Sequence, residues 1–179
     1  MDKPAGTMLG SGPSSIDMTS TLLPVENFSL DASARKILRA LQENCRISVA
    51  ELAGKLGMST TPCWRRQKEL EEQGYIKRYA AIVDRRKVGL DVCCYASISL
   101  ARHAEGVVAN FEAAMKMRPE VVDCYETTGT SDYLVKIVVA DMDAYHDFLH
   151  NVLFRLDGVA QVSTSVTLRE VKSDTALPF

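Results

Sequence analysis

The chain has 179 residues, of which 46% are hydrophobic, and a formal net charge of −2. This length allows one domain or two small ones, each with a core of its own. No apolar run approaches the roughly 18 residues of a membrane span, and the N-terminus lacks a basic region followed by an apolar stretch. We therefore expect a soluble, cytoplasmic protein with no membrane partner.

Basic and acidic residues are unevenly distributed along the chain. Residues 28–87 hold 13 Lys and Arg against 7 Asp and Glu, whereas residues 88–179 hold 7 against 13. A basic cluster confined to one segment is the charge pattern expected of a nucleic-acid-binding module. The split favours two domains and makes double-stranded DNA the first candidate partner. The five cysteines are odd in number and lack paired C-x-x-C spacing, so we expect reduced core residues, no metal site and no cofactor.

The N-terminal part of the chain has two different compositions. Residues 1–28 are rich in Ser, Thr, Gly and Pro and show no periodicity, so we expect a disordered tail. Asp31 then stands where a helix cap is expected, and apolar residues recur on one face of the next helix: Ala34, Ile37, Leu38 and Leu41. This helix is the first element of a DNA-binding domain expected over residues 29–84.

Two short helices joined by a tight turn are predicted next, in the order of a helix-turn-helix. Ser48 and Glu51 have the spacing of a capping box, so one helix begins directly after Ser48. Gly57 is the residue type that commonly ends a helix. Pro62 fits the first turn of the second helix, which is expected to run to about Gln73.

The second helix of the pair carries hydroxyl and basic side chains, whereas Cys63, Gln67 and Leu70 recur on one face that should pack inward. This is typical of a recognition helix, whose N-terminal residues reach base edges while Arg and Lys hold phosphates. A solvated basic helix on a small helical protein is the alternative. The residues expected to contact DNA, including two from the segment that follows, are Ser59, Thr60, Thr61, Arg65, Arg66, Lys68, Lys77 and Arg78.

The residues after this helix connect it to the rest of the chain. Tyr75–Val83 is expected to form a strand, the wing of a winged helix-turn-helix, with Lys77 and Arg78 near the DNA backbone. An ordinary linker strand is the alternative. Residues 85–91 combine charge with a Gly and are expected to form a hinge linker.

The periodicity of residues 92–179 predicts strand, helix, strand, strand, helix, strand. The strands are expected at residues 92–100, 121–128, 133–140 and 159–171. The order βαββαβ indicates a ferredoxin-like sandwich, so the whole chain belongs to the α+β class. Because both helices of such a sandwich cover one face of the sheet, we expect a homodimer in which a second copy covers the other face.

The segment TTPCWRRQKELEEQGYI and the later segment GTSDYLVKI together resemble the leucine-responsive regulator (Lrp/AsnC) family. The resemblance covers about residues 29–173. It implies a winged helix-turn-helix joined by a hinge to a βαββαβ domain, which dimerises and often assembles into octamers that wrap DNA. It also implies a nucleoid-associated transcriptional regulator of amino-acid metabolism, with an amino acid bound between dimers as the effector.

The family's ligand loop has the form G-x-x-D-Y, and residues 129–133 match it. The resemblance implies that Asp132 accepts hydrogen bonds from the ammonium group of the ligand, while free N–H groups of the turn bind its carboxylate. An ordinary hairpin turn is the alternative. Glu126 departs from the apolar residue of the family pattern, which leaves the charge of the ligand open. The implied effector-binding residues are Thr128, Gly129, Thr130, Ser131, Asp132, Tyr133 and Thr164.

Two other classes of protein are alternatives to a transcriptional regulator. His146 and His150 lie four residues apart, a spacing that places two imidazoles on one helix face, as in metal-dependent enzymes. No third ligand is obvious in the sequence, so we expect neither an enzyme nor a metal site. An architectural DNA-binding protein without an effector would have nearly the same sequence. A response to an amino acid separates it from a sensor.

Overall fold

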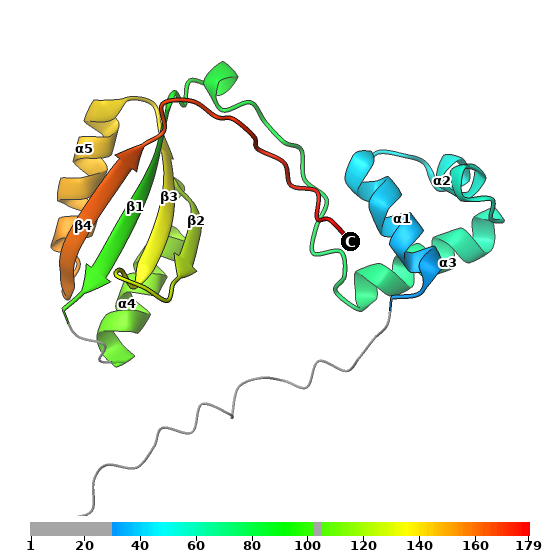
Figure 1. The fold of residues 1–179 in the computed structure, drawn as a ribbon, viewed down its shortest axis with the longest axis horizontal. Coiled ribbons are helices and arrows are strands. Elements are labelled where there is room, and N and C mark those ends of the chain that lie inside the picture. The colour runs from blue at the N-terminus through cyan, green and yellow to red at the C-terminus, as the bar shows by residue number, and fades with distance from the viewer. Residues whose placement is uncertain (1–29, 102–104) are drawn as a thin grey trace, which may run out of the picture. The chain divides into compact units, whose positions relative to one another are not determined.

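The computed structural model describes residues 30–101 and 105–179, and the tail expected at residues 1–28 lies outside them. The chain divides into two compact units (Figure 1). A helical unit ends at Lys77 and also includes Ala176–Phe179, and a sheet unit spans Arg78–Thr175. Within the described ranges, no helix has the length and apolar character needed to cross a membrane.

The helical unit contains the three expected helices, α1 (Ala32–Glu43), α2 (Val49–Leu56) and α3 (Thr60–Glu72). The apolar face predicted for the first helix is buried, as expected. Burial of this face against α2 and α3 forms one small core, because each helix is apolar on one side only. The buried residues of this core are Ala34, Ile37, Leu38, Ala40, Leu41, Leu52, Ala53, Cys63 and Leu70.

The ends of these helices follow the predicted capping residues. The Ser48 hydroxyl accepts a hydrogen bond from the Glu51 N–H at 3.2 Å, and the Ser48 N–H donates to the Glu51 carboxylate at 2.9 Å. Gly57 ends α2 with φ of 66°, a left-handed conformation that glycine adopts without strain. The capping box and the turn are therefore confirmed. Ser59 is the N-cap residue of α3, but its side chain makes no capping hydrogen bond.

The segment after α3 differs from the prediction. Residues 75–83 form no strand, so the prediction of a wing strand was wrong. A strand needs a neighbour to pair its N–H and C=O groups, and no strand of the described chain pairs with this segment. Lys77 and Arg78 are exposed in this irregular segment. Their side chains therefore reach solvent without the support of a hairpin.

The predicted hinge contains a short 3-10 helix, η1 (Arg86–Val88). The guanidinium group of Arg85 donates to the carbonyl oxygens of Leu90 and Asp91 at 2.8 and 2.6 Å. The Asp91 N–H donates to the carbonyl oxygen of Ala140 in the sheet unit. The end of the connecting segment is thus held on the sheet unit by hydrogen bonds of its own.

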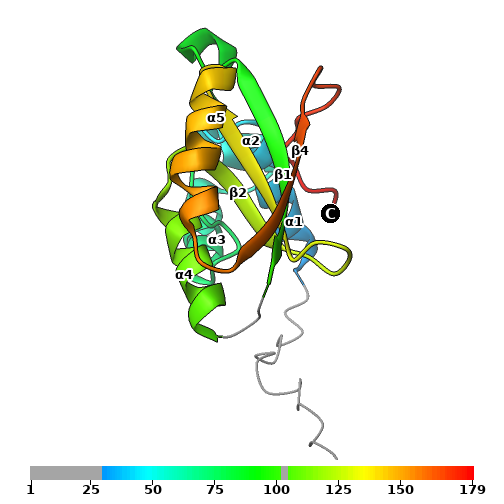
Figure 2. The same cartoon turned by 90° about the vertical axis from the view of Figure 1, so that its left-hand side faces the viewer.

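The sheet unit has the predicted βαββαβ order. Its elements are β1 (Val92–Leu100), α4 (Glu105–Met117), β2 (Val121–Glu126), β3 (Tyr133–Val139), α5 (Met142–Asn151), η2 (Leu153–Arg155) and β4 (Val159–Val166). The strand order is β2-β3-β1-β4, and each neighbouring pair is antiparallel. Both α-helices cover the same face of the sheet (Figure 2). This is the expected ferredoxin-like arrangement.

Three strands end earlier than predicted, β3 by only one residue, at Val139. β2 ends at Glu126 instead of residue 128, because the chain turns into a loop in which the Thr127 N–H donates to the carbonyl oxygen of Asp132. β4 ends at Val166 instead of residue 171. The Thr167 N–H still donates to the carbonyl oxygen of Cys93 in the neighbouring strand β1. Because β1 begins at Val92, the chain beyond Thr167 has no strand beside it with which to pair.

The two faces of the sheet have different environments. Ala96 and Ile98 of β1 are fully buried and pack against the aromatic residues Phe111 of α4 and Phe148 of α5. Side chains alternate along a strand, so the neighbouring residues point to the opposite face. On that face Tyr95 is 40% exposed. The uncovered face is therefore partly apolar, which is the surface that the predicted dimer would bury.

Candidate DNA-binding helix and effector site

The outward side of α3 presents the predicted hydroxyl and basic groups. Thr60, Thr61, Arg65 and Lys68 are all exposed. Arg65 pairs with Glu69 at 3.7 Å and Lys68 pairs with Glu71 at 3.4 Å. Exposed ion pairs of this kind contribute only about 0–1 kcal/mol, so both cations can exchange their partners for phosphate groups at little cost.

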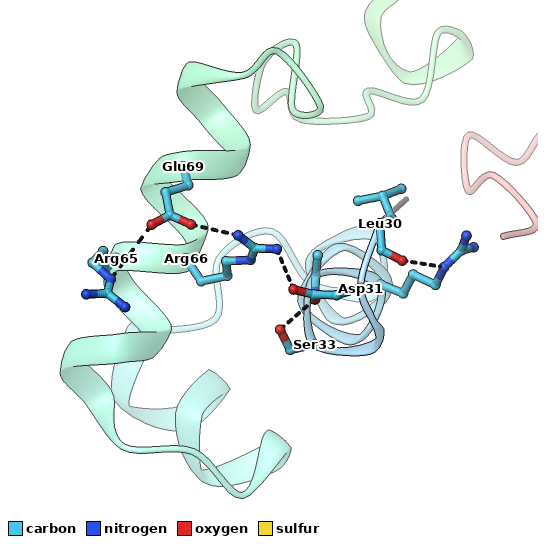
Figure 3. Close-up of polar contacts among 8 residues, drawn as sticks. Leu30, Asp31, Ser33, Arg65, Arg66 and Glu69 are labelled. Carbon is cyan, nitrogen blue, oxygen red and sulfur yellow. Dashed lines mark hydrogen bonds and ion pairs between the residues drawn. The ribbon is translucent and has the colours of Figure 1, made fainter. Parts of the chain in front are cut away.

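Arg66 points in a different direction from Arg65, toward the start of α1 (Figure 3). Its guanidinium group pairs with Glu69 at 2.8 Å and with Asp31, and its side chain is only 26% exposed. The hydrogen bond to Glu69 raises the pKa of Arg66, and the Ala34 N–H, the Ser33 hydroxyl and the charge of Arg66 lower the pKa of Asp31. Arg66 therefore links α3 to α1 within the helical unit.

The structure adds one residue to this surface that the sequence pattern did not select. Trp64 lies on α3 between the exposed Thr60 and Lys68, and its side chain is 53% exposed. The sequence signal that could have identified it is a large aromatic residue spaced four residues from both Thr60 and Lys68, on the polar side of the predicted helix. Ser59 is also exposed, at the start of the same helix.

The predicted ligand loop connects β2 to β3 and is fixed to the end of β1 by Asp132. The Asp132 carboxylate accepts a hydrogen bond from the Leu100 N–H at 2.7 Å, and the Asp132 N–H donates to the carbonyl oxygen of Ile98 at 2.9 Å. The Thr127 hydroxyl donates to the carbonyl oxygen of Ser131 at 2.8 Å. The intervening residues are exposed: Thr128, Gly129 and Thr130. The loop is thus closed by hydrogen bonds and open to solvent at its tip.

Two of the predicted effector residues point beneath the helices and away from this loop tip. Tyr133 is only 3% exposed, and its hydroxyl donates to the carboxylate of Glu112 at 3.3 Å. Burial, assisted by Glu112, raises the pKa of Tyr133 to about 12. The Thr164 hydroxyl is hydrogen-bonded to the hydroxyl of Tyr145 on α5. A single chain therefore brings Thr128 to Asp132 together but places Tyr133 and Thr164 inside the unit.

A pocket of about 370 Å³ lies between α4 and β2, next to the ring of Tyr133. Its walls combine apolar side chains with two acids and one base. Burial raises the pKa of the Cys124 thiol in this pocket. The sequence had singled out only Glu126 and Tyr133, because the other lining residues have no motif of their own. The pocket is lined by Glu112, Met115, Lys116, Val121, Val122, Cys124, Glu126 and Tyr133.

The histidine pair on α5 does not form a recognisable metal centre. The rings of His146 and His150 lie 4.3 Å apart between centroids, and His150 meets Phe154 edge-on at 5.2 Å. In residues 30–101 and 105–179, no group of three or more His, Cys, Asp or Glu residues could hold a metal ion. The pair is therefore part of an aromatic row that continues from α5 to Phe154 in η2.

Comparison with known proteins identifies both units. Residues 30–77 match the family model described as a winged helix-turn-helix DNA-binding domain, and residues 93–177 match the Lrp/AsnC ligand-binding domain. The chain belongs to the Lrp/AsnC family. This Lrp/AsnC chain is 38% identical over 150 residues to the Bkd operon transcriptional regulator of Pseudomonas aeruginosa, covering 84% of this chain and 98% of the relative. It is also 38% identical to the leucine-responsive regulatory protein of Salmonella typhimurium, covering 83% of this chain and 90% of that one.

Solved structures agree with this family membership. A transcriptional regulator from Neisseria meningitidis, in complex with L-Met, is 36% identical with a TM-score of 0.80, over 84% of this chain and 97% of that chain. An AsnC family regulator from Agrobacterium tumefaciens is 40% identical with a TM-score of 0.79, over 83% and 96%. Lrp/AsnC proteins are DNA-binding transcription regulators, so the chain is a regulator of this kind and not an enzyme.

Proposed function

We propose that this Lrp/AsnC regulator binds double-stranded DNA through the outward side of α3 and the segment after it. The main support is the different environment of two neighbouring arginines. Arg65 is exposed and pairs with Glu69 only at 3.7 Å, whereas Arg66 is mostly buried between Asp31 and Glu69. The proposed contacts are Ser59, Thr60, Thr61, Arg65, Lys68, Lys77 and Arg78, with Arg66 positioning α3.

The two arginines provide a matched test of this proposal. A duplex is first selected in vitro with the full chain, and its affinity is measured by fluorescence anisotropy at fixed salt. Arg65→Ala should lower the affinity by about 1–3 kcal/mol if it contacts a base. Arg66→Ala should instead lower the thermal stability of the helical unit. Unchanged affinity for Arg65→Ala would count against the assignment of the DNA-binding side.

We further infer that the effector is an amino acid. The support is the similarity to a regulator whose structure contains L-Met, together with the hydrogen-bonded loop at Asp132. Thr128 to Asp132 would bind the charged ends of the ligand at an oligomer interface, because a carboxylate accepts from ammonium and turn N–H groups bind a carboxylate. Tyr133 and Thr164, which lie beneath the helices, would support the site from inside.

An amino-acid screen by thermal shift, followed by DNA binding, tests the effector. We expect at least one amino acid to raise the melting temperature and to change DNA affinity. Asp132→Asn should abolish both responses, whereas Asp157→Asn, at an exposed position outside the loop, should retain them. Absence of any response in the unmodified chain would support the alternative, an architectural DNA-binding protein without an effector.

We also propose that the uncovered face of the sheet forms a homodimer, which assembles further into an octamer or a higher oligomer. Tyr125 is 59% exposed on this face, and Phe154 is 54% exposed after α5. Tyr125→Asp should therefore lower the mass measured by light scattering, whereas Phe154→Asp should leave the dimer intact. In such a dimer, the two recognition helices could bind two half-sites about one DNA turn apart. An unchanged mass for Tyr125→Asp would show that the dimer does not form through this face of the sheet.

A further inference from the structure

The indole ring of Trp64 lies exposed on α3. It is 53% exposed and makes no hydrogen bond or ring contact with any residue in the described part of the chain. Thr60 and Lys68, one helical turn away on either side, are exposed as well. The three side chains therefore form one continuous strip of hydroxyl, aromatic ring and ammonium group along the helix.

The rotation of α3 about its axis is fixed by contacts on its other side. Cys63 and Leu70 are at most 1% exposed, and Arg66 is held by Asp31 and Glu69. Because these residues anchor the helix to its own unit, Trp64 cannot turn into the core. The ring stays on the side of the helix that carries the proposed phosphate contacts.

We propose that Trp64 determines DNA sequence specificity through apolar contact with the C5-methyl groups of thymine. The N-terminal residues of a recognition helix enter the major groove. The thymine methyl is the apolar group that base pairs display there, and an indole ring has no acceptor with which to read base donors. This inference rests on the proposed DNA-binding side of α3 and adds the chemistry that this side recognises.

Replacing thymine by deoxyuridine removes only this methyl group and therefore tests the inference directly. In a duplex selected with the full chain, each thymine is replaced in turn, and affinities are compared between the unmodified protein and Trp64→Ala. At one or two positions the unmodified protein should lose about fourfold in affinity, the change that burial of one methyl group corresponds to. Trp64→Ala should show no such loss.

Two outcomes would overturn the role of Trp64 without affecting the proposed function. One is equal affinity for all deoxyuridine duplexes, and the other is the same loss in Trp64→Ala as in the unmodified protein. Trp64→Leu, which keeps an apolar side chain, should retain part of the thymine preference. Phe154→Ala, an exposed aromatic position in the sheet unit, should behave like the unmodified protein. Failure of the proposed function itself would appear as no preference for the selected duplex.

Discussion

The two units of this regulator are stabilised in different ways. Among the described residues, the helical unit buries nine residues in its core and the sheet unit buries fourteen. The smaller core supplies less apolar burial, so polar contacts at the helix ends become a larger share of its stability. The Asp31 cap, the Ser48–Glu51 capping box and the Arg66 ion pairs all lie in the helical unit. We therefore expect the helical unit, which binds DNA, to have the smaller free energy of unfolding.

The largest expected effect comes from the core of the sheet. Ile98 is fully buried at the centre of β1, so Ile98→Ala should lower the free energy of unfolding by about 2–5 kcal/mol, and Ile98→Val by about 0.5–1.5 kcal/mol. The chain has a single tryptophan, Trp64 of the helical unit, whose fluorescence reports that unit alone. Urea unfolding followed by circular dichroism should shift, while the tryptophan transition should move little. A shift of both transitions together would show that the units unfold as one.

A smaller effect is expected from the capping box of α2. Ser48→Ala removes the acceptor of the Glu51 N–H, which should cost about 1 kcal/mol in the helical unit. This loss should appear in the tryptophan transition. Ser163→Ala, at an exposed position of β4, is the matched control and should leave that transition in place. Equal effects of the two serine variants would contradict the difference between the units.

The effect expected from Tyr133 appears only at alkaline pH. Its pKa is raised from 10.0 to about 12 in the folded sheet unit, so the neutral hydroxyl is favoured by folding. The corresponding stability is fully present below pH 10 and is lost as the pH rises through about 12, because the unfolded tyrosine ionises first. Tyr133→Phe should flatten this alkaline loss in the sheet unit. An identical loss in both proteins would exclude Tyr133 as its source.

Features that depend on residues close together in the sequence could be predicted. The capping box joins Ser48 to Glu51 and the turn needs only Gly57, so local spacing was sufficient for both. The alternation of residues 92–100 likewise predicted β1 to the residue, because every second residue from Cys94 to Leu100 is buried and the residues between them are more exposed. Helix caps and strand periodicity are properties of a few consecutive residues.

Features that depend on distant residues could not be predicted. Arg66 has the same local surroundings as Arg65 in the sequence, and its partner Asp31 is the N-cap residue of another helix, α1. The wing strand was expected from β-forming residues, but strand formation requires a pairing partner that composition does not reveal. The α4 side of the pocket, including Glu112, follows from how α4 packs on β2, and no motif marks it.

We propose that the helical unit binds DNA sequence-specifically and that the sheet unit transmits the binding of an amino acid to it. Fluorescence anisotropy at matched salt can compare a duplex selected with the full chain with a scrambled duplex of equal length. We expect tighter binding to the selected duplex, a change in that affinity with the amino acid found by thermal shift, and loss of this change in Asp132→Asn. Equal affinity for both duplexes, unaffected by every amino acid, would contradict it.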